Sequence, residues 1–430
     1  MKRYETYKDS GIEWLGEIPN HWMEEKLKHI VSCNDDVLDE TTDPEEIINY
    51  VEISDVDSIN GVNNHTQYRF KEAPSRARRI TKKGDVIVST VRTYLKAIAP
   101  IKEDNLIVST GFAVLRPRKI ESSFVSYALQ NEFFLGEVVS RSTGVSYPAI
   151  NSTDLVEIKI PVPSADEQRI IASYLDDKVG QIDAVIAEKE KMVEDLQNYR
   201  KSVISEAVTR GLNPDVPMKD SGIDWIGMIP EHWIVSKLKA FADVQTGSTP
   251  STSVDKYWEN PIEDWYTPSD FEDSDIQLKP SSRKLATIAF KEEACRVFDA
   301  NTVLIVGIGA TLGKVGISSK SCSANQQINA VTFKEKVLPL FGAYYLYSIK
   351  DTMKAVANAA TLAIMNQSTT KDLPFICPPY EEQRSIVKAI DNKISVTANG
   401  VSELQAQIED LKSYKSSLIT EAVTGKIDLR

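Results

Sequence analysis

The sequence predicts an α+β protein with a pseudo-twofold internal repeat: two mixed α/β heads joined by two long helices that pair with each other as a coiled coil. Three observations predict this fold, namely opening and closing segments that occur twice, heptad patterns in the closing segments, and β-rich middles that differ. The expected order is a first head over residues 1–160, a spacer helix over 161–215, a second head over 216–375 and a spacer helix over 376–430.

The opening of each half is nearly the same sequence. YKDSGIEWLGEIPNHWMEEKLK runs from Tyr7 to Lys28, and MKDSGIDWIGMIPEHWIVSKLK runs from Met218 to Lys239. Turn formers and aromatic residues dominate both copies, which favours a turn-rich motif fixed by aromatic core anchors. The expected anchors are Trp14, Trp22, Trp225 and Trp233, although a patch that occurs twice could instead face two copies of one partner. His21 and His232 are interpreted as structural residues.

The middle of each half is rich in short β-branched runs broken by Gly, Asp, Asn and Ser, which is typical of strands and turns. In the second half Gly307, Gly309 and Gly313 imitate a dinucleotide-binding turn. The residues that follow predict another strand instead of the helix whose amides would hold a pyrophosphate. A nucleotide site is therefore not expected there.

The closing segments predict two long helices. DEQRIIASYLDDKVGQID starts at Asp166 and EEQRSIVKAIDNKISVTA at Glu381, and apolar residues then recur at alternating steps of four and three. Only Lys189 and Arg200 interrupt the first seam. Heptads of this kind indicate a coiled coil, although each helix could instead pack on its own head. Gly211 and Gly425 are the expected helix stops.

The composition excludes several classes of protein. The chain has 430 residues, 50 Lys+Arg and 62 Asp+Glu, so its net charge of −12 excludes a uniformly basic nucleic-acid coat. The start has no apolar stretch of signal-peptide length, and no later window is long and apolar enough for a membrane span, so a cytoplasmic protein is expected. Four dispersed cysteines suggest neither a disulfide framework nor a zinc site.

Local charge points instead to the heads. Between Arg69 and Lys119 there are thirteen basic residues against four acids, and between Lys279 and Lys334 eight against three. Clustered Lys and Arg neutralise phosphate, and Arg, Asn and Gln can pair with base edges, although a solvated basic face without a ligand would look the same. The candidate DNA-binding residues are Arg76, Arg78, Arg79, Lys82, Lys83, Thr90, Arg92, Tyr94 and Lys96 in the first head, and Arg283, Lys284, Thr311, Lys314, Asn325, Gln326 and Gln327 in the second.

Catalytic signatures are missing from the sequence. ICPPY, from Ile376 to Tyr380, is similar to the loop with which amino-methyltransferases hold their target base, but Cys377 stands where an amide or carboxylate is needed. No metalloprotease, nucleophile-elbow, Walker or paired-carboxylate nuclease pattern occurs. We therefore expect a binding protein with no catalytic residues and no metal site.

As a set, these motifs resemble the specificity subunit of a Type I restriction-modification system over essentially the whole chain. The resemblance rests on the two KDSG openings, the stretch TGSTPSTSVDKYWENPIEDWYTPSDF from Thr246 to Phe271, the strands KKGDVIVST and ANTVLIVGIGATLGKVGI, the segment ANQQINA, and the two E-Q-R-x-I helix entries that follow prolines.

The resemblance implies a non-catalytic reader of double-stranded DNA in which each head is a target-recognition domain for one half of a bipartite, asymmetric site. It implies that the helices pair antiparallel, set the spacing and dock two modification subunits, with restriction/translocase subunits joining that core and no membrane involved. No cofactor is then expected on this chain, while S-adenosylmethionine, ATP and Mg²⁺ belong to the partner subunits. The alternative is a coiled-coil scaffold with two protein-binding heads.

Overall fold

The computed structural model describes residues 2–12, 15–57, 61–273, 275–358 and 364–430, and the chain forms two compact units. Unit 1 comprises Met1–Glu190 with Gln405–Arg430, and unit 2 comprises Lys191–Leu404. Each unit therefore holds one head, the front of one long helix and the back of the other. The division between the units falls inside both helices. It therefore does not test the domain boundaries expected from the sequence, which stay a prediction.

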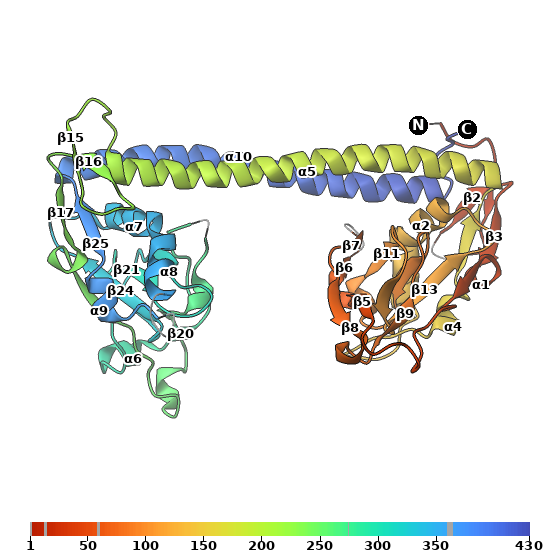
Figure 1. Cartoon of the computed structure of the whole chain (residues 1–430), viewed down its shortest axis with the longest axis horizontal. Helices are drawn as coiled ribbons and strands as arrows, with labels where there is room; N and C mark the ends of the chain where they lie inside the picture. The colour runs from red at the N-terminus through yellow and green to blue at the C-terminus, as the bar shows by residue number, and fades with distance from the viewer. Residues whose placement is uncertain (1, 13–14, 58–60, 274, 359–363) are drawn as a thin grey trace. The chain divides into compact units, whose positions relative to one another are not determined.

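A four-stranded antiparallel sheet forms the centre of each head, with the same strand order in both. Figure 1 labels two of its strands in each head, β11 and β13 in unit 1 and β21 and β24 in unit 2. The order is β11-β10-β13-β4 in unit 1 and β22-β21-β24-β18 in unit 2. The central strands VIVS and VLIV are buried throughout, which explains why they read as unbroken apolar runs. The bounds are β4 Val31–Cys33, β10 Val86–Ser89, β11 Ile98–Pro100, β13 Phe112–Pro117, β18 Ala242–Thr246, β21 Val303–Val306, β22 Val315–Ile317 and β24 Ile328–Phe333.

A second sheet contains a parallel strand pair in each head, β5 with β12 in unit 1 and β19 with β23 in unit 2. An antiparallel strand flanks each pair, β8 beside β5 and β20 beside β19. The heads therefore share this core topology, to which unit 1 adds β9 beside β12, and they are of mixed α/β type, as the sequence predicted. The bounds are β5 Ile47–Val51, β8 Thr66–Arg69, β9 Ala77–Ile80, β12 Leu106–Ser109, β19 Glu263–Tyr266, β20 Lys284–Leu285 and β23 Ser323–Ala324.

Short helices and two-stranded pairs complete the heads. Strand β14 pairs with β3, and β25 with β17, so the end of each head returns to its start. The helices are α1 Leu27–Ile30, α2 Ser122–Gln130, α3 Glu132–Ser140, α4 Ser152–Leu155, α6 Thr287–Lys291, α7 Pro339–Ser348, α8 Lys350–Asn358 and α9 Gln367–Lys371. The remaining strands are β1 Tyr7–Asp9, β2 Glu17–Pro19, β3 Met23–Lys26, β6 Val56–Asp57, β7 Gly61–Val62, β14 Lys159–Val162, β15 Met218–Asp220, β16 Met228–Pro230, β17 Ile234–Lys237 and β25 Pro374–Cys377.

The repeated opening folds into a hairpin, β1–β2 in unit 1 and β15–β16 in unit 2. Trp22 and Trp233 follow these hairpins and are buried, so their prediction as core anchors is confirmed. The prediction for Trp225 is wrong: this side chain is 41% exposed, because it sits in the turn of its hairpin. Trp14 lies outside the described residues.

The same opening joins the ends of the two long helices within each unit. The Nε2 atoms of His21 and His232 lie 2.9 and 2.8 Å from the carboxylates of Glu167 and Glu382 near the helix starts, which confirms that both histidines are structural. The turns after the helix ends, at Gly425 and Gly211, contact Trp22 and Trp233. Both glycines have positive φ, and a Cβ atom would lie 2.3 Å from Pro19 at Gly425 and 3.1 Å from Glu382 at Gly211, so the expected helix stops are confirmed.

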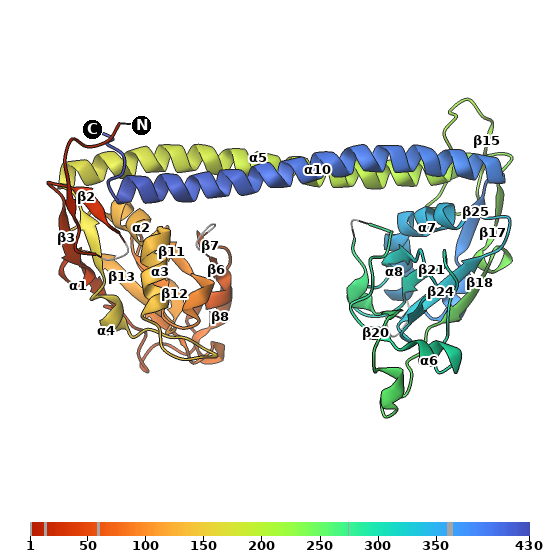
Figure 2. The same cartoon turned by 180° about the vertical axis from the view of Figure 1, so that it is seen from behind.

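Helices α5 (Ala165–Arg210, 46 residues) and α10 (Tyr380–Val423, 44 residues) form the predicted coiled coil (Figure 2). In unit 1 Lys415 Nζ lies 2.7 Å from an Asp183 oxygen and Lys189 Nζ lies 2.6 Å from Gln407 Oε1, so residue numbers rise on one helix as they fall on the other. The pairing is antiparallel. Buried seam residues include Leu175, Val179, Ile182 and Ile186 of α5, and Leu404, Ile408 and Leu418 of α10. Neither helix, nor any other described helix, meets the length and hydropathy that a membrane span needs.

Candidate nucleic-acid interface

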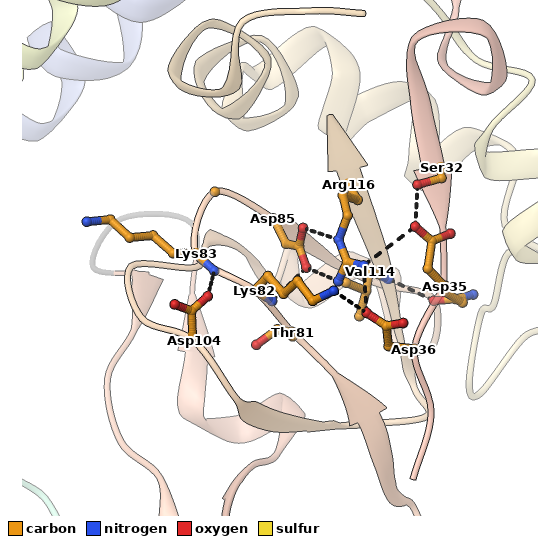
Figure 3. A network of polar contacts seen from close by, with 12 residues as sticks. Ser32, Asp35, Asp36, Thr81, Lys82, Lys83, Asp85, Asp104, Val114 and Arg116 are labelled. Carbon is orange, nitrogen blue, oxygen red and sulfur yellow. Dashed lines mark hydrogen bonds and ion pairs between the residues drawn. The ribbon is translucent and has the colours of Figure 1, made fainter. Parts of the chain in front are cut away.

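The basic residues between Arg69 and Lys119 form the basic strip of the first head. Fewer of them are available to a ligand than the composition indicates, because several form ion pairs with acids (Figure 3). The Arg116 guanidinium donates to both oxygens of Asp85 at 2.9 and 2.8 Å and to Asp36 at 2.7 Å. Its side chain is 12% exposed and that of Asp85 is 2% exposed. Burial of this pair between β4, β10 and β13 makes it part of the head's interior and removes Arg116 from any DNA-facing surface.

Three of the predicted DNA-binding residues of this head have internal partners. Lys82 Nζ lies 3.0 Å from Asp36 in the same network. Arg79, on β9, donates to Asn34 Oδ1, and burial lowers the pKa of its guanidinium. The Thr90 hydroxyl donates to the Gly111 carbonyl at 2.9 Å, and the residue is buried. We therefore leave Arg79 and Thr90 out of the interface proposed below.

The remaining predicted residues of the first head reach its surface. Arg78 lies with its guanidinium carbon 4.8 Å from the centre of the Phe70 ring. Arg76 and Lys83 are exposed in turns beside β9 and β10 and make no ion pair with a described residue. Lys83 also lines a groove of about 940 Å³ between the head and the helices of unit 1. Their role in DNA contact stays a prediction.

A loop after β10 presents Arg92, Tyr94 and Lys96 together, each of them exposed. It is held against a second loop by paired backbone at Val91 and Ala149. Arg92 lies over the ring of Tyr147, with its guanidinium carbon 5.0 Å from the ring centre.

Two residues of this second loop were missed by sequence reasoning. Val145 and Tyr147 are both well exposed, in the segment GVSYP. An apolar and an aromatic residue among turn formers are a signal that could have marked an exposed loop. The nearness of Tyr147 to Arg92 depends on long-range pairing and leaves no local trace in the sequence.

In the second head the predicted polar residues Asn325, Gln326 and Gln327 form the turn between β23 and β24. The Asn325 amide nitrogen lies 2.9 Å from Gln327 Oε1, and Asn325 Oδ1 accepts from the Gln327 N–H at 3.0 Å. Gln326 accepts from the Thr249 hydroxyl at 2.5 Å. Because these contacts hold all three side chains of the turn and leave Gln326 and Gln327 exposed, the turn is pre-organised for a polar ligand.

A glycine makes this turn possible. A Cβ atom at Gly247 would lie 2.3 Å from the Asn325 carbonyl oxygen and 2.4 Å from that of Ala324. The N–H of Ser248 also donates to Ala324, at 2.8 Å. The TGSTP stretch therefore packs its backbone directly against the polar turn, which places Thr249 beside Gln326.

Arg283 lies over two tryptophan rings at the edge of the same head. Its guanidinium carbon is 4.9 Å from the Trp265 ring centre and 5.4 Å from that of Trp258. Cation–π contact of this kind fixes the plane of the guanidinium while its N–H groups stay available. Lys284, next to it, lies 3.5 Å from Asp264.

Lys314 and Thr311 are less suited to contact a ligand. Lys314 donates to the Phe271 carbonyl at 2.9 Å and also lies near Asp273, so its charge supports the head's interior. Thr311 is half-buried in the loop after β21. Sequence reasoning missed Arg296, whose side chain donates to the Thr246 carbonyl and whose N–H donates to the Ser248 hydroxyl at 2.7 Å. Arg296 is one of the eight basic residues counted between Lys279 and Lys334, so local charge was the signal that could have marked it.

Comparisons with known proteins agree with the repeated architecture. A family model described as Type I restriction modification DNA specificity domain matches residues 19–194 and 230–410. A chain of Methanocaldococcus jannaschii that carries the name type I restriction enzyme MjaX specificity subunit is 27% identical, over 97% of this chain and 96% of the relative. The type I restriction enzyme StySPI specificity subunit of Salmonella potsdam is 22% identical, over 73% of this chain and 67% of the relative.

Among solved structures, a chain reported for the structural basis of complex assembly and conformational transition of the type I R-M system has the same fold. It superposes with a TM-score of 0.71 at 23% identity and covers 95% of this chain and 99% of that one.

Proposed function

The chain belongs to the Type I restriction-modification DNA specificity family, and from this premise we propose that each of its heads reads one half of a bipartite, asymmetric DNA site. Recognition of a DNA target is the function of the family. The finer proposal concerns how the two heads divide the DNA target between them.

One observation carries the proposal: the heads share one backbone but present different side chains at equivalent places. The turn before the last strand of the central sheet is Ser109-Thr110-Gly111 in the first head and Asn325-Gln326-Gln327 in the second. Conversely, the loop after the central strand holds Arg92 and Lys96 in the first head where the second has Gly309 and Gly313. Side chains that pair with base edges therefore stand on different loops, which supports two unlike half-sites.

The long helices carry a surface that occurs twice and is suited to two copies of one partner. In each E-Q-R helix entry the Glu contacts a histidine of the opening, and the Gln bonds the head through both the oxygen and the nitrogen of its amide. The partners of these glutamines are the N–H groups of Glu121 and Leu338 and the carbonyls of Pro163 and Pro378, at 2.7 to 2.9 Å.

The arginine of each entry has no such internal role. Arg169 and Arg384 are 69% and 64% exposed, and among the described residues each forms an ion pair only with an acid three residues earlier on its own helix. Exposed pairs of this kind contribute little stability. The proposal assigns these arginines to the docking of two modification subunits, one on each unit, with restriction/translocase subunits joining the assembly.

Within this proposal the chain contributes recognition and the partners contribute chemistry. S-adenosylmethionine is assigned to the modification subunits, and ATP and Mg²⁺ to the restriction subunits.

The proposal is tested by expressing the chain with its modification subunit in a host without DNA methylation and mapping methyladenine. The expected result is one motif with two unlike halves separated by a fixed unspecified gap, and no motif when the modification subunit is expressed alone. A single uninterrupted motif, or no dependence on this chain, would contradict it.

A further inference from the structure

The loop after the central strand follows the same backbone path in both heads. The N–H of Thr90 donates to the Gly111 carbonyl at 2.8 Å, as that of Gly307 does to Gln327 at 2.7 Å. Three further backbone bonds match in the same way, at 2.8 to 3.0 Å. They are Ser89 to Ala97 with Val306 to Lys314, Leu95 to Arg92 with Leu312 to Gly309, and Ile150 to Thr90 with Met365 to Gly307. These matched bonds make Arg92 equivalent to Gly309 and Lys96 equivalent to Gly313.

Both equivalent positions require left-handed backbone. Gly309 and Gly313 have φ of 87° and 82°, which glycine adopts without steric cost. Arg92 and Lys96 have φ of 52° and 51°, where a Cβ atom crowds the backbone. The stability of this loop would therefore favour glycine at both positions, as in the second head. The first head instead carries two long cationic side chains there, and strain of this kind concentrates at functional sites.

The strained loop presents a surface suited to the inside of a DNA groove. Arg92 lies against the exposed ring of Tyr147, which orients the plane of the guanidinium. Tyr94 of the same loop and Val145 of the loop that holds Tyr147 are also exposed, and Lys96 adds a second cation. Neither Arg92 nor Lys96 makes an ion pair with any residue that the structure describes. Both charges therefore remain available to a ligand.

We propose that Arg92 is the specificity-determining residue of the first head and reads a guanine in its half-site. A guanidinium held in a fixed plane can donate two parallel hydrogen bonds to the O6 and N7 atoms of guanine. Tyr147 is a positioning residue for that plane, and Lys96 contacts the neighbouring phosphate. The inference rests on the proposed function. It adds which loop of the first head reads a base, which atoms pair with that base, and why the loop keeps a strained backbone.

Arg92→Gly tests this inference because structure and recognition should respond in opposite directions. In the full chain with its modification subunit, the variant should have a Tm equal to or above that of the parent, because the strain is relieved. Its affinity for the parent's target should fall about fivefold to 150-fold, the range for loss of a bidentate base contact. The methyladenine map should lose the guanine requirement at one position in one half-site and keep the other half unchanged.

Two more variants sharpen the result. Arg92→Asn keeps a residue that tolerates left-handed backbone and should lose the guanine requirement in the same way, so the test does not depend on glycine. Asn105→Gly is the matched control, because Asn105 is an exposed left-handed residue of the same head, with φ of 63°, outside the loop. It should leave the motif and the affinity unchanged.

The inference is overturned if Arg92→Gly and Arg92→Asn methylate the parent motif with the parent's stringency. It is also overturned if affinity falls equally for all sequences, since that is the behaviour of a phosphate contact. A parent chain that yields no bipartite motif would instead be a failure of the proposed function, and the two failures are therefore distinguishable.

Discussion

Arg116 is the residue on which the polar interior of the first head depends. It bridges Asp85 of one turn and Asp36 of another, and the carboxylate of Asp85 is almost completely buried. Arg116→Met would leave that carboxylate without its partner, so we expect a loss of about 3–5 kcal/mol in the free energy of unfolding. Urea denaturation of the full chain measures it. Arg118→Met, which breaks an exposed pair with Asp35, is the matched control and should cost less than about 1 kcal/mol.

The same network gives the head a defined sensitivity to acid. Hydrogen bonds from Arg116 and Lys82 hold the pKa of Asp36 below its usual value. Because the folded pKa is the lower one, the contact stabilises the head above the unfolded pKa of about 4, and this stability is lost as the pH falls through the folded pKa.

We therefore expect Asp36→Asn to be less stable than the parent at pH 7 and to show a smaller further loss below about pH 4. Urea midpoints at pH 7 and pH 3 measure this. Glu40→Gln, at an exposed acid without a described ion pair, is the control. Equal acid sensitivity of Asp36→Asn and the parent would contradict the assignment.

At the scale of elements, the coiled coil carries a polar break at Lys189 that the repeated helix replaces with an apolar residue. Lys189 lies in the seam and bonds Gln407, whereas the position equivalent to Lys189 in the second helix is Leu404, which is buried. Polar seam residues fix register at a cost in stability. The break is thus expected to specify how the two helices align.

Lys189→Leu is accordingly expected to raise the free energy of unfolding by about 1 kcal/mol, the scale of burying an additional apolar side chain in part. The urea midpoint measures the gain. Lys191→Leu, at an exposed position two residues away, is the matched control and should give none. A lower midpoint for Lys189→Leu would show that the Gln407 contact outweighs apolar packing.

At the scale of the whole molecule, a net charge of −12 means that DNA affinity depends on few cations. Ion pairs with acids make five cations of the basic strip less available to DNA. They are Arg116, Arg118, Arg69, Lys71 and Lys82. Each phosphate contact contributes about 0.9 to the slope of log affinity against log salt.

We expect Arg76→Ala to reduce that slope by about 1 and Lys71→Ala, whose ammonium pairs with Glu45, to leave it unchanged. Titration of labelled duplex DNA at several salt concentrations measures both. Equal slopes for the two variants would show that pairing with Glu45 does not withhold Lys71 from DNA.

Much of the fold could be predicted from the sequence because its determinants are local or repeated. The two openings, the heptads and the glycine stops each leave a pattern within one stretch of chain, and Trp22, Trp233, Gly211 and Gly425 behave as expected. The partners of individual cations could not be predicted. Arg116 meets Asp36 through strand pairing between distant segments, and no periodicity records such a contact.

The candidate site also has a part that could be predicted from the sequence and a part that could not. Arg92 and the Asn325–Gln327 turn stand out by residue type, and the structure places them in exposed loops. By contrast, Arg79 and Thr90 form hydrogen bonds inside the head, Tyr147 lies against Arg92, and Arg296 bonds Ser248. These contacts follow from tertiary packing and could not be predicted. Charge counting treats every lysine and arginine as free and therefore overestimates the basic surface.

The central claim is that one head reads one half-site, and two methyladenine maps test it most directly. One map is made with Arg92→Gly in the first head and the other with Gln326→Ala and Gln327→Ala together in the second. The account predicts that each variant relaxes bases in a different half of the parent motif and leaves the opposite half intact. Relaxation of both halves by either variant, or of the same half by both, would contradict it.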